Sequence, residues 1–137
     1  MNWKLILLLS LFGLAIGLAT VSLIPSNIEP FCWLVAFLIS SYAIAKYAPG
    51  KYFLHGFLVS CVNSVWVTAA HVAMFYTYIA NHPEYLQATN GLPPTLAGHP
   101  RRMMVPIGII SAILFGIILG LFAWIASKIF KKTAPVA

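Results

Sequence analysis

Four long apolar stretches, almost free of charge, are the feature of this sequence that most limits its fold. They cover about residues 5–24, 31–48, 52–80 and 103–130, and no Asp, Glu or Arg lies inside them. About 20 apolar residues in a helix cross a hydrocarbon core of about 30 Å. A backbone in lipid must satisfy its hydrogen bonds internally, and no barrel-like alternation is present. We therefore expect each stretch to be a transmembrane helix.

The composition excludes the other broad classes of protein. Of the 137 residues, 61% are hydrophobic and 7% are charged, whereas a soluble domain is about 25% charged. Disordered chains are poor in apolar residues, so the same numbers exclude disorder. The net charge is +6, but the basic residues flank apolar stretches and form no basic stripe. The lipid bilayer is therefore the expected partner, and nucleic acid is not.

The short turns between the first three stretches predict how the helices are arranged. Residues 25–30 and 48–51 leave room only for tight turns, so neighbouring helices run antiparallel. We predict an all-α fold in which residues 1–137 form a single transmembrane domain, an antiparallel four-helix bundle. The first stretch is about twice as long as the apolar part of a signal peptide, so we expect it to stay as a span.

The distribution of basic residues predicts the orientation of the bundle. Two arginines, Arg101 and Arg102, fall on one side of the expected membrane. The other side carries six lysines: Lys4, Lys46, Lys51, Lys128, Lys131 and Lys132. We expect the protein in the inner or plasma membrane of the cell. Because cytoplasmic loops carry the excess of basic residues, both termini are expected to lie in the cytoplasm.

The loop at residues 81–102 is long enough to carry structure or function of its own. Pro83 suits the first turn of a helix and Asn90-Gly91 suits its end, which predicts a short helix on the outer surface. The loop also holds five candidate site residues: His82, Glu84, His99, Arg101 and Arg102. Their spacing matches no zinc motif, so we predict no metal site. The two arginines either reach lipid phosphates or bind an anionic ligand.

Small residues recur at helical spacing on two of the stretches. They are Gly13 and Gly17 on the first, and Gly108, Ala112, Gly116 and Gly120 on the fourth. Such faces allow the backbones of membrane helices to approach closely. They predict either packing within one bundle or a homo-oligomer.

The third stretch carries a polar stripe along its length. At 100° per residue, one arc contains Ser60, Asn63, Ser64, Thr68 and His71. Depth in the membrane suggests Thr20 or Ser111 as a partner for His71, and Ser40 or Ser41 as a partner for Asn63. The stripe either joins helices or forms a functional site, since a His inside a membrane points to function. No second His lies at a matching depth, so no haem or other cofactor is predicted.

Three functions remain open at this point. The first expectation is a non-enzymatic component that assembles with itself or serves as a subunit of a larger membrane complex. The second is a small-solute or ion conduit or transporter lined by the polar stripe. The third is a membrane-embedded enzyme or ligand binder that uses His71 with the outer loop. Enzymatic activity is disfavoured, because the sequence shows no recognisable set of catalytic residues and no Cys-x-x-Cys pair.

Overall fold

The structure is a computed structural model that describes residues 1–130, and all its regular elements are helices. Within that range, four helices are long and apolar enough to cross a membrane: α1 (Trp3–Ser22), α2 (Glu29–Tyr47), α3 (Tyr52–Ala73) and α7 (Pro100–Ile129). The predicted all-helical fold with four apolar helices is confirmed. Lys131 and Lys132, which entered the prediction of orientation, lie outside the described residues.

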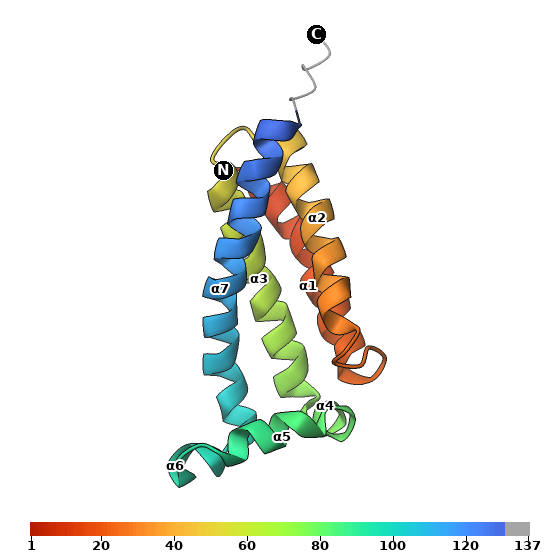
Figure 1. Cartoon of the computed structure of the whole chain (residues 1–137), viewed down its shortest axis with the longest axis vertical. Coiled ribbons are helices and arrows are strands. Elements are labelled where there is room, and N and C mark those ends of the chain that lie inside the picture. Colours follow the sequence, from red (N-terminus) through yellow and green to blue (C-terminus); the bar gives the residue numbers. More distant parts are fainter. Residues whose placement is uncertain (131–137) are drawn as a thin grey trace.

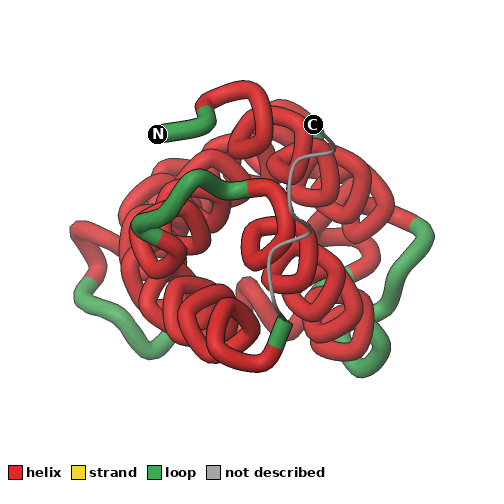
Figure 2. The backbone as a smooth tube through the Cα atoms, turned by 90° about the horizontal axis from the view of Figure 1, so that it is seen from above, coloured by secondary structure: helices red, strands yellow, loops and turns green. Residues whose placement is uncertain are grey.

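The helix α3 lies at the centre of the packing (Figure 1). It packs most extensively against α7 and α1, whereas α2 packs mainly against α7. The N-terminus and the end of α7 lie at one end of the molecule, which we call the terminal end. The opposite end holds the α1–α2 turn and three short helices, α4 (Phe75–Asn81), α5 (Pro83–Asn90) and α6 (Pro94–Ala97). We call it the capped end. Figure 1 shows α2 diverging from α7 toward it, and Figure 2 shows the helices from above.

The apolar core fills the half of the molecule nearer the terminal end. It is formed by nine buried side chains: Leu5, Ile6, Leu9, Phe37, Ile44, Ala48, Val59, Leu119 and Ala123. His55 is fully buried near this end. Its Nε2 accepts a hydrogen bond of 3.0 Å from the backbone N–H of Asn2, and its Nδ1–H donates to the carbonyl oxygen of Lys51 at 3.0 Å. This ring therefore joins the start of α1 to the start of α3.

Small residues let α1 and α7 approach α3 closely. A Cβ built on Gly13 would lie 2.5 Å from Cα of Asn63, and one built on Gly56 would lie 2.5 Å from the backbone oxygen of Leu119. A Cβ built on the glycine at 17, 108, 116 or 120 would also lie within 3.0 Å of an atom of α3. Ala112 is half-buried. Close packing of these faces is therefore made inside one chain.

Two boundaries differ from those predicted. The apolar stretch 52–80 does not form one helix, because α3 ends at Ala73 and α4 begins at Phe75. The 22 residues of α3 already give about 33 Å of helix, enough to cross the hydrocarbon core. The remaining residues turn aside, and α4 packs against α1 and buries Phe75. At the other boundary α7 begins at Pro100, before the predicted start at about residue 103, and Pro106 lies inside the helix.

The short surface helix predicted in the 81–102 loop is present as α5, and its bounds agree with the Pro83 and Asn90-Gly91 signals. A second short helix, α6, which was not predicted, follows and begins at Pro94. Together with α4 they cover the capped end (Figure 1).

Candidate functional site

A cavity of about 220 Å³ lies between α2, α3 and α7, in the half of the molecule nearer the capped end. Phe37 lines the cavity and also belongs to the apolar core, so the core bounds the cavity on the side toward the terminal end. Tyr78 of α4 and Tyr85 of α5 line its other end, which we call its mouth. The cavity thus extends from the apolar core to the short helices of the capped end.

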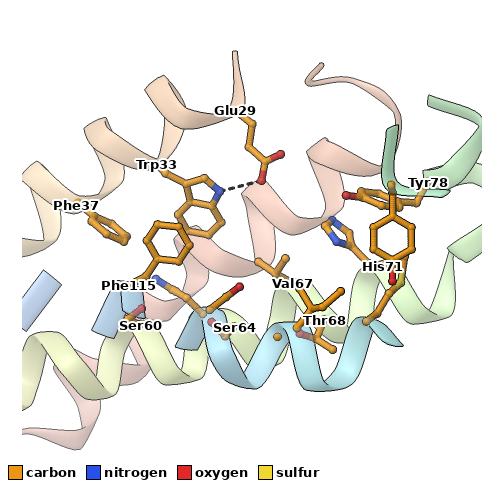
Figure 3. Close-up of a pocket in the computed structure, with 16 residues that line it drawn as sticks. Glu29, Trp33, Phe37, Ser60, Ser64, Val67, Thr68, His71, Tyr78 and Phe115 are labelled. Carbon is orange, nitrogen blue, oxygen red and sulfur yellow. Dashed lines mark hydrogen bonds between the residues drawn. The ribbon is translucent and has the colours of Figure 1, made fainter. Parts of the chain in front are cut away.

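The polar stripe of α3 forms one wall of this cavity (Figure 3). All five residues predicted from helical periodicity line it: Ser60, Asn63, Ser64, Thr68 and His71. Figure 3 labels Ser60, Ser64, Thr68 and His71. Their spacing of three or four residues keeps them on one face of a single helix. The structure therefore brings the whole stripe together along one hollow space.

Two members of the stripe are held by α1. Oδ1 of Asn63 accepts a hydrogen bond of 3.1 Å from the backbone N–H of Gly13. Nε2 of His71 lies 2.9 Å from Oγ1 of Thr20, whose hydroxyl also donates to the carbonyl oxygen of Gly17 at 3.1 Å. Because a hydroxyl has one hydrogen, we assign it to the Gly17 carbonyl and place a proton on Nε2 of His71. The neutral ring then keeps Nδ1 as an acceptor.

The hydroxyl groups around the cavity have no hydrogen-bond partner within residues 1–130. They belong to Ser60, Ser64 and Thr68 on α3 and to Ser111 on α7, which all line the cavity. Their oxygen atoms are not enclosed by protein, because among the described residues only Nε2 of His82 is a buried polar side-chain atom without a partner. These groups are therefore available to water or to a bound molecule.

The opposite wall, from α2 and α7, is aromatic and carries one carboxylate. Glu29, Trp33 and Phe37 lie four residues apart on α2 and all line the cavity. Nε1–H of Trp33 donates to Oε1 of Glu29 at 3.1 Å, as the dashed line in Figure 3 shows. Trp33 packs edge-on against Phe37 at 6.1 Å between ring centroids, and Phe37 packs against Phe115 at 6.2 Å. Sequence reasoning missed this wall, although its i, i+4, i+8 spacing was visible.

Aromatic stacking organises the mouth of the cavity. The ring of Tyr78 lies between His71 at 4.1 Å and His82 at 4.4 Å, stacked on both. The hydroxyl of Tyr85 donates to the carbonyl oxygen of Pro100 at 2.8 Å, which ties α5 to the start of α7. Burial, followed by the negative charges of Glu29 and Glu84, raises the pKa of Tyr78 to about 12.

The five candidate residues of the outer loop do not join the cavity wall. His82 is buried; its Nδ1–H donates to the carbonyl oxygen of Tyr78, and its Nε2 has no partner among the described residues. Glu84 is exposed and accepts a hydrogen bond from the Ser26 hydroxyl, the main cause that keeps its pKa below the usual value. Arg101 is exposed, and its Nε–H donates to the carbonyl oxygen of Val72 at 2.8 Å.

The remaining loop candidates, His99 and Arg102, are exposed. Within residues 1–130 no group of three His, Cys, Asp or Glu side chains is placed to hold a metal ion. Cys32 and Cys61 are both free thiols and half-buried. The loop residues therefore serve the cap: Ser26 and Glu84 join the α1–α2 turn to α5, and Arg101 joins α7 to α3.

The comparisons with known proteins were made against family models, curated proteins and solved structures. None of the three finds a match for this chain.

Proposed function

We propose that this chain is a four-span membrane protein that acts as a small-solute carrier. Its binding site is the cavity toward the capped end, which takes a small organic solute. In this proposal the capped end faces the outside of the cell and both termini face the cytoplasm. The terminal end carries Lys4, Lys46, Lys51 and Lys128, whereas Arg101 and Arg102 lie at the capped end. This distribution supports the orientation.

The observation that carries the proposal is the position of the polar stripe. Five polar residues of one apolar helix line a cavity, and the hydroxyl groups among them have no partner within the described residues. Polar groups inside a membrane protein are costly unless they are paired, and they commonly mark a substrate site. A cavity of about 150 Å³ holds a benzene molecule. The cavity of about 220 Å³ therefore has room for a single-ring compound that carries a polar group.

The apolar core that bounds the cavity favours a carrier or binding protein over an open channel. Below Phe37 the core side chains Ile6, Ile44 and Leu119 are fully buried, and none of these three lines the cavity. Passage of a solute would require these helices to move apart at that end. Carriers release a solute in this way, by alternating the end that is open.

The other two functions have less support. The glycine faces, which suggested self-assembly, already make their close contacts with α3 of the same chain. A site built from His71 and the outer loop would need the loop residues in the cavity, and they lie outside its wall. The cavity of α2, α3 and α7 is therefore the feature on which we base the function.

A cavity-filling substitution tests the proposal. In lipid nanodiscs, para-fluorobenzyl alcohol is expected to bind saturably, as measured by fluorine NMR after subtraction of empty discs. Ser64→Phe places a ring in the cavity and should weaken this binding about tenfold or more, a loss of about 1.4 kcal/mol. Ala69→Phe adds the same ring to the exposed face of α3 and should leave binding unchanged. Equal signals from wild type and both variants, as lipid partitioning would give, contradict the proposal.

A further inference from the structure

We propose that the cavity selects small organic cations, with an ammonium group held at Glu29 and Trp33 and the apolar body of the ligand beside Phe37 and Phe115. This inference rests on the proposed function, because it names the class of ligand that the same cavity takes. It goes beyond that function in stating the charge of the ligand and the residues that read it.

The carboxylate of Glu29 is the first step of the argument. Glu29 is the only acidic residue that lines the cavity, and it is half-buried at the start of α2. The Trp33 indole N–H holds one of its oxygens in place. Within residues 1–130, no basic side chain forms an ion pair with it. A half-buried carboxylate without a cation is an incomplete pair, and a cationic ligand completes it.

The charges around the cavity point the same way. Among residues 1–130, no Lys or Arg lines the cavity. Arg101, at the capped end, donates its Nε–H to the Val72 carbonyl and is not part of the cavity wall. The carboxylate of Glu29 is therefore the charge that the described wall presents to a ligand. A negative charge on the wall attracts cations and repels anions.

The aromatic side chains supply the second part of the site. The hydrogen bond from Trp33 to Glu29 fixes the indole ring beside the carboxylate, and Figure 3 shows both at the cavity. A cation within about 6 Å of an indole face gains about 0.5–2 kcal/mol, and the gain is largest where water is excluded. Beyond Trp33, the edge-to-face chain through Phe37 and Phe115 offers an apolar surface for the rest of the ligand.

The polar wall of α3 fits the same ligand class. His71 keeps Nδ1 as an acceptor in the tautomer assigned above, and the hydroxyl oxygens of Ser64 and Thr68 are also free to accept. An ammonium group that bears hydrogens can donate to these atoms, whereas a carboxylate or phosphate would face Glu29 with no counter-charge. The cavity thus matches a protonated primary, secondary or tertiary amine on a single-ring body, or a quaternary ammonium group through its charge alone.

Two probes of nearly the same shape test this inference by displacing para-fluorobenzyl alcohol from the protein in nanodiscs. Benzyltrimethylammonium carries the charge, and neopentylbenzene is its uncharged isostere. The wild-type protein should bind the ammonium about tenfold more tightly than the isostere. Glu29→Gln should remove this preference and keep binding of the isostere, which shows that the variant is folded. Glu84→Gln, which neutralises the exposed acid outside the cavity wall, should keep the preference.

The outcomes separate the two proposals. Equal affinity for both probes in the wild-type protein overturns the cation site and leaves the solute-binding function standing. If neither probe displaces a reporter that binds saturably, the cation site is also overturned and solute binding still stands. If the reporter itself does not bind saturably, both proposals are overturned. The natural ammonium group could belong to a free solute or to a lipid headgroup. To distinguish them, binding of the ammonium probe is measured in nanodiscs of phosphatidylglycerol and in nanodiscs that contain phosphatidylcholine. Weaker probe binding in phosphatidylcholine identifies a lipid headgroup as the occupant, and equal binding identifies a free solute; both results support an ammonium site.

Discussion

Gly56→Ala is expected to destabilise the protein by about 3 kcal/mol, the upper end of what overpacking a close contact costs. A Cβ at this position would lie 2.5 Å from the backbone oxygen of Leu119 and 2.9 Å from Cα of Gly120. Both atoms belong to the backbone of α7, so no side-chain rotation relieves the overlap. The two helices that pack most extensively must then move apart along their contact. Chemical unfolding in a mild detergent measures the loss.

Gly116→Ala provides the matched control for this prediction. Its Cβ would meet the ring of Phe57 at 2.8 Å, and a side-chain ring is able to turn away where a backbone is not. Ala also favours a helix over Gly by about 1 kcal/mol, which offsets part of the cost. We expect a change within about 1 kcal/mol. Equal destabilisation by the two substitutions would show that the α3–α7 contact is not made backbone to backbone at Gly56.

His55→Leu is expected to cost about 2 kcal/mol, because it removes two hydrogen bonds at the terminal end. The fully buried imidazole is the side-chain partner of the Asn2 N–H and also donates to the Lys51 carbonyl. Leu fills a similar volume but leaves the Asn2 N–H unpaired. The midpoint of thermal unfolding in detergent should fall, and the start of α1 should become more open to proteolysis.

His99→Leu serves as the comparison for the His55 substitution. His99 is exposed, precedes α7 and makes no side-chain capping hydrogen bond. Its replacement should leave the unfolding midpoint nearly unchanged, as expected for surface positions. If both substitutions lower the midpoint equally, the effect follows from losing an imidazole in general and not from the contacts of His55.

Much of the fold could be predicted because hydrophobic length and turn residues act locally. The four apolar helices follow from stretches long enough to cross a membrane, and α5 follows from Pro83 and Asn90-Gly91. The break between α3 and α4 at Met74 could not be predicted, since neither Gly nor Pro marks it. It depends on the packing of α4 against α1, a contact between distant parts of the chain.

The candidate site was predictable on one wall only. Helical periodicity placed the five polar residues of α3 on one face, and depth left Thr20 and Ser111 as partners for His71, of which the structure shows Thr20. Depth failed for Asn63, whose partner is the Gly13 N–H and not Ser40 or Ser41. Depth fixes the level of a residue in the membrane but not the rotation of each helix about its axis. For the same reason, the wall formed by Glu29 and Trp33 was not found.

The central claim is that the polar stripe of α3 lines a cavity open to the outside of the cell. The most direct test labels single cysteines, in a chain without Cys32 and Cys61, with a membrane-impermeant quaternary-ammonium thiosulfonate. A cysteine replacing Ser64, in the cavity wall, should react in intact cells. One replacing Ala69, on the exposed apolar face of α3, should not. A position 64 that reacts only in inverted vesicles, or no faster than position 69, would contradict the account.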